Sequence, residues 1–120
     1  MKTLKIGIAS PEAYKRRTLG IAEGRRLPNK GEPKIWFDSL ATLSQVLSDQ
    51  NRSLLRLIVE EQPQSLQELA KSSGRATSNL SRTLRTMERY GLVQLEAGPN
   101  RQLIPRVPWS GVEFTVSFQS

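Results

Sequence analysis

The sequence Ser65-Leu-Gln-Glu-Leu-Ala-Lys-Ser-Ser-Gly74-Arg-Ala-Thr-Ser-Asn-Leu-Ser-Arg-Thr-Leu-Arg-Thr-Met-Glu-Arg-Tyr-Gly91-Leu-Val93 decides the fold. Its first part has the pattern of a capping box, in which the Ser65 hydroxyl accepts from the amide of Glu68 and the Glu68 carboxylate reaches back to the amide of Ser65. Apolar residues at i, i+3 and i+4 from Leu66 give this short helix one buried stripe. Gly74 stands where the chain must turn sharply. The pattern predicts a short helix followed by a tight turn.

A second helix is predicted from Thr77 to Tyr90, because Leu80, Leu84 and Met87 recur at i, i+4 and i+7 and fix its buried face. At about 100° per residue, the opposite face can be read from the sequence. The positions farthest from the stripe are Arg75, Ser78, Arg82, Arg85 and Arg89, with Asn79, Ser81 and Thr86 on the flanks. Two helices joined in this way form a helix-turn-helix whose second helix is positively charged.

The outward side chains of the second helix match the chemistry of nucleic-acid recognition. Guanidinium groups read guanine O6 and N7 in bidentate fashion and neutralise phosphates, whereas asparagine reads adenine. Serine and threonine hydroxyls bond to phosphates or base edges. The alternative interpretation is an ordinary solvated face, which arginines also decorate.

A β-hairpin is predicted directly after the second helix. Gly91 ends the helix at its C′ position, and the alternation over 92–96 indicates a strand. A turn over 97–100 follows, and residues 101–105 return as the antiparallel partner, with Pro105 stopping the ladder. Such a hairpin is a wing.

With these elements in place, residues 50–105 resemble the winged helix-turn-helix of MarR/ArsR-like bacterial and archaeal transcriptional regulators. The resemblance is carried by Leu66-Gln-Glu-Leu-Ala70 and by Asn79-Leu-Ser-Arg-Thr-Leu-Arg-Thr-Met-Glu-Arg-Tyr-Gly-Leu-Val93. It implies an α+β fold with a three-helix core and a β-hairpin wing, to which this chain adds N- and C-terminal strands. Winged helices also bind RNA or proteins, so the resemblance favours DNA without excluding those partners.

The resemblance also implies positions for the DNA contacts. The residues nearest base edges would be Thr77, Ser78, Asn79, Arg82 and Thr83. Arg85 and Arg89 would lie nearer the DNA backbone, and Arg101 would lie at the wing tip near the minor groove. The helical periodicity independently supports Ser78, Arg82 and Arg85, but it places Thr83 closer to the buried stripe. Arg75 and Ser81 complete the predicted DNA-binding set from their place on the outward face and its flank.

Composition limits the classes of function. With 120 residues the chain has room for one modest core, and it contains no cysteine and no histidine, which excludes disulfides and thiolate or imidazole metal sites. No metal and no cofactor are expected. The net charge of +7 favours a polyanionic partner. No stretch reaches the roughly 20 apolar residues that cross a bilayer, and the N-terminal run is too short for a signal peptide, so we expect a cytoplasmic protein without membrane contact.

The charge is unevenly distributed along the chain. Residues 1–34 carry a net charge of +6, residues 35–74 carry −2 and residues 75–120 carry +3. The acidic middle part corresponds to the side of a winged helix that faces away from DNA or onto a partner. Two basic runs are candidates for binding phosphate, Lys15-Arg16-Arg17 and Arg25-Arg26. The alternative is that the first belongs to a solvated helix face and the second to a loop.

Three segments are expected along the chain. Residues 1–37 contain a strand over 3–8, a helix from Ser10 to about Glu23, a basic loop and a short strand over 34–37. Residues 38–109 form the DNA-binding domain, and residues 110–120 form a C-terminal strand for dimer or partner contact. That strand has Val112, Phe114, Val116 and Phe118 on one side, and its partner is the 4–8 strand, the 34–37 strand or a second subunit.

Two helices are expected ahead of the capping box. Leu40, Leu43, Val46 and Leu47 form the stripe of a short helix opened by Asp38 or Ser39, which packs on the core or lies in a dimer interface. Leu54, Leu55, Ile58 and Val59 form the stripe of a longer helix capped by Ser48 or Asp49, which runs to about Glu61 and is stopped by Pro63.

No catalytic residues are expected, because the sequence offers no histidine or cysteine, no phosphate-binding glycine loop and no carboxylate pair on one helix face. We therefore expect a sequence-specific regulator that binds double-stranded DNA as a homodimer and acts as a repressor. The alternatives are the DNA-binding antitoxin of a toxin–antitoxin pair, with a cognate toxin as protein partner, and a winged-helix adaptor for protein or RNA.

Overall fold

The computed structural model describes residues 2–8, 33 and 35–116. These residues form helices and small sheets of an α+β protein, as predicted. The chain divides into two compact units, one spanning Val46–Trp109 and the other made of Lys2–Gln45 with Ser110–Ser120.

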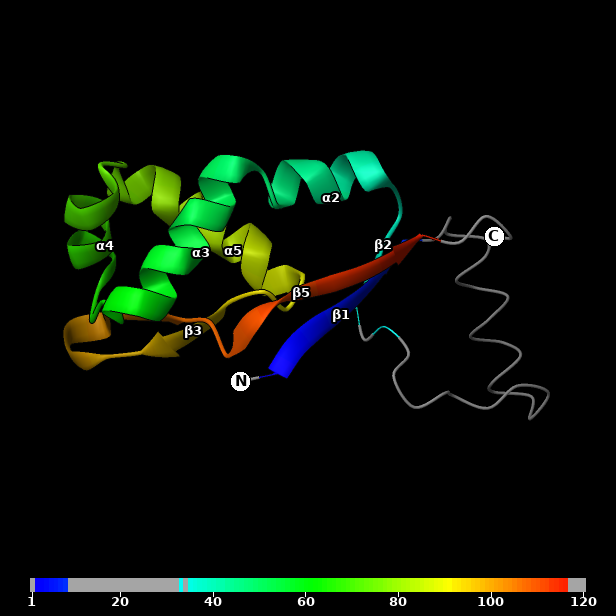
Figure 1. Cartoon of the computed structure of the whole chain (residues 1–120). Helices are drawn as coiled ribbons and strands as arrows, with labels where there is room; N and C mark the ends of the chain where they lie inside the picture. Colours follow the sequence, from blue (N-terminus) through cyan, green and yellow to red (C-terminus); the bar gives the residue numbers. More distant parts are fainter. Residues whose placement is uncertain (1, 9–32, 34, 117–120) are drawn as a thin grey trace. The chain divides into compact units, whose positions relative to one another are not determined.

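The first unit contains three helices followed by a β-hairpin (Figure 1). The helices are α3 (Asp49–Glu61), α4 (Leu66–Ser73) and α5 (Thr77–Arg89), and the hairpin consists of β3 (Gln94–Ala97) and β4 (Leu103–Arg106) around a short 3-10 turn, η1 (Pro99–Arg101). The buried apolar residues of its helices and of the segment after α5 are Leu54, Ile58, Leu69, Leu80, Leu84, Met87, Leu92 and Val93. The stripe predicted for α5 is therefore confirmed, whereas Leu55 and Val59 of the α3 stripe are only half-buried.

Helix α3 begins and ends where the sequence predicts. Ser48 is the N-cap, and its hydroxyl accepts from the amide of Asn51 at 3.2 Å. After Glu61, the left-handed Gln62 (φ 48°) caps the C-terminus, and Pro63 follows. Of the two candidate caps, Ser48 fills the role and Asp49 is the first helical residue.

The cap of α4 differs in one bond from the predicted capping box. The Ser65 hydroxyl accepts from the amide of Glu68 at 3.1 Å, as expected. The Glu68 carboxylate, however, accepts from the amide of Gln64 at 2.7 Å rather than from that of Ser65. The reciprocal bond has moved one residue back, so two amides at the start of the helix are still satisfied.

The turn between α4 and α5 depends on Gly74, which ends α4 in the left-handed region at φ 72°. A Cβ atom placed there meets no heavy atom within 4 Å, so there is space for a side chain. What disfavours one is the left-handed backbone conformation.

We therefore expect Gly74→Ala to lower the free energy of unfolding by about 1 kcal/mol, because alanine must adopt the left-handed backbone. Thermal unfolding followed by circular dichroism measures this loss. Gly74→Asn serves as the matched variant, since asparagine tolerates the left-handed region. A loss from Asn as large as that from Ala would contradict the explanation.

The C-terminus of α5 is closed by a Schellman motif. The amide of Leu92 donates to the Met87 carbonyl at 3.0 Å, and the amide of Gly91 donates to the Glu88 carbonyl at 3.0 Å. Gly91 has a φ of 76°, which confirms its predicted C′ role, and Tyr90 is the cap rather than the last helical residue. Because the motif uses residues 91 and 92 and Val93 is buried before the ladder begins, β3 starts at Gln94 instead of Leu92.

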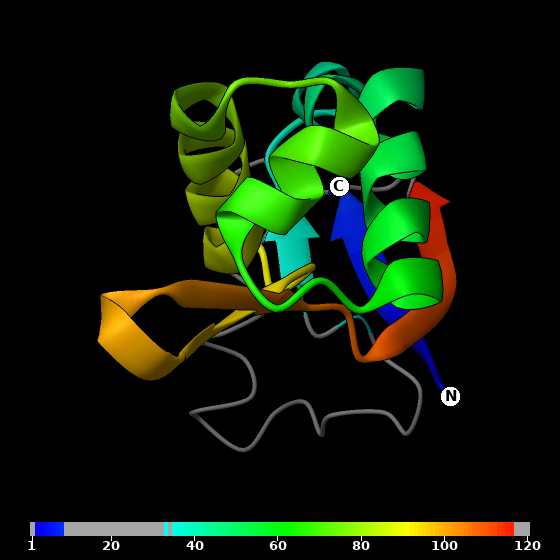
Figure 2. The same cartoon turned by 90° about the vertical axis from the view of Figure 1, so that its left-hand side faces the viewer.

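The hairpin pairs Gln94 with Arg106 and Ala97 with Leu103 in an antiparallel register. The predicted turn at 97–100 is displaced to 98–102, where the Gly98 amide donates to the Gln102 carbonyl at 2.7 Å. The prediction that Pro105 stops the ladder is wrong, because Pro105 lies opposite Leu95 and β4 continues to Arg106. Figure 2 shows the hairpin extending beyond the helices of this unit.

The second unit is built on a three-stranded sheet in the order β2-β1-β5. Its strands are β1 (Lys2–Ile8), β2 (Ile35–Phe37) and β5 (Trp109–Val116), and helix α2 (Leu40–Val46) follows β2. β1 and β2 are parallel, with Gly7 opposite Trp36, and Figure 2 shows the arrow of β5 pointing the same way. The Thr3 hydroxyl donates to the Glu113 carboxylate at 3.0 Å between β1 and β5.

The C-terminal strand therefore pairs with the first strand, one of the three partners that the sequence left open. β5 starts at Trp109 and not at Gly111, and Phe118 lies outside the described residues. Ser39 opens α2, with its hydroxyl accepting from the Thr42 amide at 3.1 Å.

The segments expected before α3 have different outcomes. The predicted stripe of α2 is only partly buried, since Leu40 is 48% exposed. The predicted helix from Ser10 to Glu23 and the basic loop after it lie outside the described residues, as do Lys15, Arg16, Arg17, Arg25 and Arg26. None of the helices in the described ranges is long and apolar enough to cross a membrane.

Candidate nucleic-acid interface

Helix α5 presents a continuous polar face on the side away from its buried stripe. Its exposed residues at the predicted positions are Thr77, Ser78, Asn79, Arg82, Arg85 and Arg89, whereas Ser81, Thr83 and Thr86 are half-buried. The helical geometry that buries Leu84 thus directs three arginines outward. We call Ser78, Arg82, Arg85 and Arg89 the arginine face.

Among the described residues, the side chains of the arginine face make only long hydrogen bonds to neutral hydroxyl groups. Arg85 Nε donates to the Ser81 hydroxyl at 3.4 Å, and an Arg89 guanidinium nitrogen donates to the Thr86 hydroxyl at 3.3 Å. Within the described part of the chain, no carboxylate lies at ion-pair distance from Arg82, Arg85 or Arg89. The three arginines of this face therefore form no ion pair with the described residues.

The exposed arginines of α3 have a different environment. Arg52 is paired with Asp49, and Arg56 Nε donates to the Glu60 carboxylate at 2.9 Å. This hydrogen bond and the negative charge of Glu60 raise the pKa of Arg56. Arginines on α3 are thus neutralised by neighbours on their own helix, which sets them apart from the arginine face.

The N-terminal turn of α5 adds to the positive character. This turn contains no acidic residue, and Ala76, the N-cap, makes no side-chain hydrogen bond to it. The amides that the helix leaves unpaired there are donors, and the helix dipole places partial positive charge beside them. Thr77, Ser78 and Asn79 surround this end of α5 with exposed hydrogen-bonding side chains.

Arg101 lies in the turn of the hairpin and is exposed, as predicted for the tip. Both Asn100 and Arg101 have left-handed backbones, with φ angles of 57° and 60°. Asparagine adopts this conformation readily, but arginine does so at a cost of about 1 kcal/mol. Strained backbones of this kind are concentrated at functional sites, which favours a role for Arg101 outside the folding of the hairpin.

Arg75 departs from the sequence-based expectation, which placed it on the outward face of the second helix. It precedes the N-cap Ala76 and so lies in the turn, where the 100° periodicity does not apply. The residue is half-buried, and its guanidinium donates to Asn79 Oδ1 at 2.9 Å, Thr83 Oγ1 at 3.2 Å and Asn51 Oδ1 at 3.3 Å. The structure thus draws Arg75 inward, toward α3.

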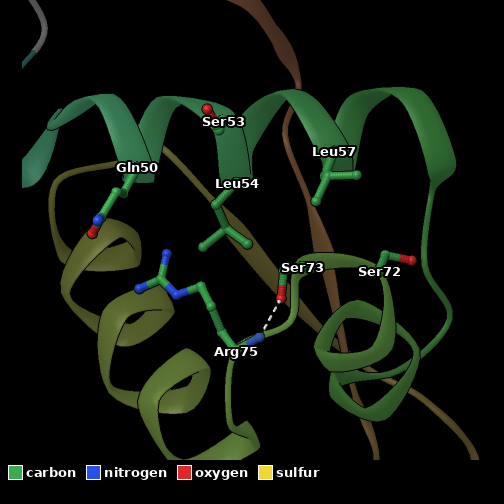
Figure 3. Close-up of a pocket in the computed structure, with 7 residues that line it drawn as sticks. All are labelled: Gln50, Ser53, Leu54, Leu57, Ser72, Ser73 and Arg75. Atoms are coloured by element: carbon green, nitrogen blue, oxygen red, sulfur yellow. Dashed lines mark hydrogen bonds between the residues drawn. The ribbon is translucent and has the colours of Figure 1, made fainter.

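A hollow of about 410 Å³ lies beside Arg75 (Figure 3). Its walls come from α3 and from the end of α4, and its lining residues are Gln50, Ser53, Leu54, Leu57, Ser72, Ser73 and Arg75. The hollow combines hydroxyl groups and one guanidinium with two leucines, and none of the arginine face lines it. It is separate from the surface described above.

Sequence reasoning missed Asn51 as a member of this cluster. Asn51 is 24 residues before Arg75, and it also donates through Nδ2 to the Val46 carbonyl at 3.0 Å, which fixes its side chain at the start of α3. No periodicity or motif connects the two residues, so only the packing of α3 against the turn reveals the contact. Among the described residues, no group of three or more acidic side chains is arranged to hold a metal ion.

Comparison with known proteins gives one finding. A family model described as HVO_A0114 matches residues 46–114, which is more than half of the 120-residue chain. No curated protein and no solved structure matches the chain. The matched residues include α3, α4, α5, the hairpin and most of β5. The chain belongs to the HVO_A0114 family.

Proposed function

We propose that this protein is a winged helix-turn-helix regulator that binds double-stranded DNA as a homodimer and represses transcription. In this proposal α4 and α5 are the helix-turn-helix, α5 is the recognition helix in the major groove and the β3–β4 hairpin is the wing. The observation that carries it is the arginine face, whose charges have no carboxylate partners among the described residues. Duplex DNA supplies such partners as phosphates and guanine edges.

The geometry of α5 fits this role. Arg82, Arg85 and Arg89 recur at intervals of three and four residues, so they line one side of the helix together with Ser78. A helix in the major groove contacts base edges mainly through its N-terminal half and phosphates along its flanks. We therefore assign base contacts to Ser78, Asn79 and Arg82, and phosphate contacts to Arg85, Arg89 and Arg101.

Titration of the purified protein against labelled nucleic acids tests this proposal. We expect tighter binding to a 30-base-pair DNA duplex than to single-stranded DNA or an RNA hairpin of equal charge, with an affinity that falls steeply as salt rises. Preference for the RNA hairpin or the single strand would instead favour the RNA-binding adaptor. Failure to bind any nucleic acid at low salt would refute the proposed function.

The homodimer is proposed to form through β5. This strand lies at the edge of its sheet in the order β2-β1-β5, and it carries two of the three large apolar side chains that are exposed in the described residues, Phe114 at 55% and Val116 at 41%. Edge strands with exposed apolar residues are templates for pairing with another strand. A second copy of β5 is the proposed partner, because a two-fold dimer uses the same surface on both subunits and so places one edge strand against its own copy.

We expect Phe114→Lys to weaken the dimer by at least tenfold, since the substitution would bury one lysine from each subunit in the same interface. Light scattering coupled to size exclusion, run over a range of concentrations, measures the change. Leu40→Lys is the matched control, because Leu40 is exposed to a similar degree (48%) but lies on α2. Equal dimer strength in the Phe114 variant and the wild type would exclude β5 as the interface.

A further inference from the structure

In the part of the chain that the structure describes, the Arg75 guanidinium connects two helices through three neutral oxygens. It donates from Nε to Asn79 Oδ1 at 2.9 Å and from its two terminal nitrogens to Asn51 Oδ1 at 3.3 Å and Thr83 Oγ1 at 3.2 Å. Asn51 belongs to α3, whereas Asn79 and Thr83 belong to α5. Figure 3 shows the guanidinium in the space between these helices. No carboxylate in the described part of the chain competes for it.

The backbone of Arg75 is also fixed. Its amide donates to the Ser73 hydroxyl at 3.2 Å, and the preceding Gly74 holds the chain in the left-handed turn. A guanidinium is a planar fork, so three bonds made by one group define its orientation closely. Arg75 is therefore held at its base by the turn and at its tip by both helices, which makes it a rigid support for the residues it contacts.

The contact with Arg75 determines how Asn79 is presented. Because Nε–H is only a donor, the atom of Asn79 that faces it must be the carbonyl oxygen, and the amide nitrogen is then directed elsewhere. Bidentate reading of adenine requires the same oxygen to accept from the adenine N6 amino group while the nitrogen donates to N7. One lone pair of this oxygen accepts from Arg75, and that bond fixes the direction of the other, so the two amide hydrogens are the groups that the exposed Asn79 presents most freely.

We propose that Arg75 is a positioning residue that sets the base preference of the recognition helix by fixing Asn79 as a hydrogen-bond donor. This inference rests on the proposed binding to DNA. A donor in the major groove matches the acceptor edges of guanine (O6 and N7) or thymine (O4), whereas adenine presents an amino group beside N7. Where Asn79 meets the DNA, the wild-type protein selects guanine or thymine over adenine.

Replacement of Arg75 with methionine, which has similar length and no donors, tests the inference. We expect Arg75→Met to shift the preference at one base pair of each half-site by about tenfold toward adenine, because the released Asn79 can then make the bidentate contact. The slope of affinity against salt should stay as in the wild type, since no phosphate contact is removed. Selection of bound duplexes followed by titration of the guanine and adenine versions of the site measures both quantities.

The double variant distinguishes positioning from a general structural effect. If Arg75 acts through Asn79, then Arg75→Met should change the base preference strongly in the wild-type background and by less than twofold in the Asn79→Ala background. An equal change in both backgrounds would overturn the inference. A uniform loss of affinity for all sequences would also overturn it if the slope of log affinity against log salt concentration fell by about one. That result would make Arg75 a phosphate contact.

Two further measurements keep the inference testable if Arg75→Met folds poorly or DNA binding fails. Thr83→Val removes one acceptor of the guanidinium with little change in shape and should shift the preference in the same direction by about two- to threefold. In the free protein, the Arg75 Nε–H should exchange slowly with solvent in NMR spectra, and Asn79→Ala should accelerate this exchange. Fast exchange in the wild type would refute the contact itself, whereas slow exchange without DNA binding would refute only the proposed function.

Discussion

If the proposed function is correct, Arg82→Ala is expected to weaken binding to the preferred DNA site by about 10- to 100-fold and to relax selection at the base assigned to Arg82. The reason is that a bidentate arginine–guanine contact contributes roughly 1 to 3 kcal/mol of discrimination. Arg82 is exposed on α5, directly opposite the buried stripe, and it has no carboxylate partner among the described residues. Fluorescence anisotropy with the preferred site and with single-base variants of it measures both effects.

Arg101→Asn provides the contrast in the turn of the β3–β4 hairpin. Asparagine tolerates the left-handed backbone that residue 101 adopts (φ 60°), so the substitution removes the charge without adding strain. We expect a similar loss of affinity for every duplex and a salt slope lowered by about one, with no change in base preference.

Arg56→Ala is the charge-matched control for both variants. It removes one positive charge from α3 rather than from the arginine face of α5, and it breaks only an exposed ion pair. It should alter DNA affinity by less than about threefold. If Arg82→Ala, Arg101→Asn and Arg56→Ala all had the same effect on all sequences, binding would depend on net charge alone.

Leu84→Ala is expected to lower the free energy of unfolding by about 2 to 5 kcal/mol. Leu84 is fully buried, and shortening such a side chain loses apolar burial and leaves a cavity. Small domains have only about 5 to 15 kcal/mol of stability, so the variant should be largely unfolded at moderately raised temperature. Chemical denaturation followed by circular dichroism measures the loss.

The matched control for Leu84→Ala is Leu40→Ala. Leu40 is 48% exposed, so its truncation should change stability by less than about 0.5 kcal/mol. A small effect at Leu84 would mean that α5 is not held by the buried stripe and would remove the basis for the orientation of the arginine face.

Local chemistry made the α4–α5 region predictable from the sequence. The cap at Ser65, the left-handed glycines at 74 and 91 and the buried stripe of α5 each depend on residues within a few positions of one another. The exposure of Ser78, Arg82 and Arg85 followed from that stripe, because a helix with a known buried face has a known outer face.

Features that depend on contacts between distant residues were not predictable in the same way. The inward position of Arg75 depends on Asn51, which is 24 residues away, and on the turn that places it before α5. The late start of β3 is a local effect by contrast, because the Schellman motif uses residues 91 and 92 and Val93 is buried before the ladder begins. Pro105 was expected to end the ladder because proline lacks an amide, but it lies opposite Leu95 and the pairing continues to Arg106 opposite Gln94.

The pairing of the C-terminal strand also depends on residues that are distant in the sequence. Alternation indicated a strand with an apolar side, but it gave three equally acceptable partners, and the sheet order resolved them in favour of β1. Whether Phe114 and Val116 are covered within the chain or left for a dimer or partner contact also stayed open, because alternation shows that residues share a face without showing what covers it.

Selection of bound duplexes from a random library with the purified wild-type protein tests the central claim most directly. The account predicts recovery of a palindrome whose half-sites lie about one helical turn apart, roughly 34 Å, because a two-fold dimer places its two recognition helices in successive major grooves. Recovery of no enriched sequence, with binding indifferent to base composition, would contradict a sequence-specific regulator.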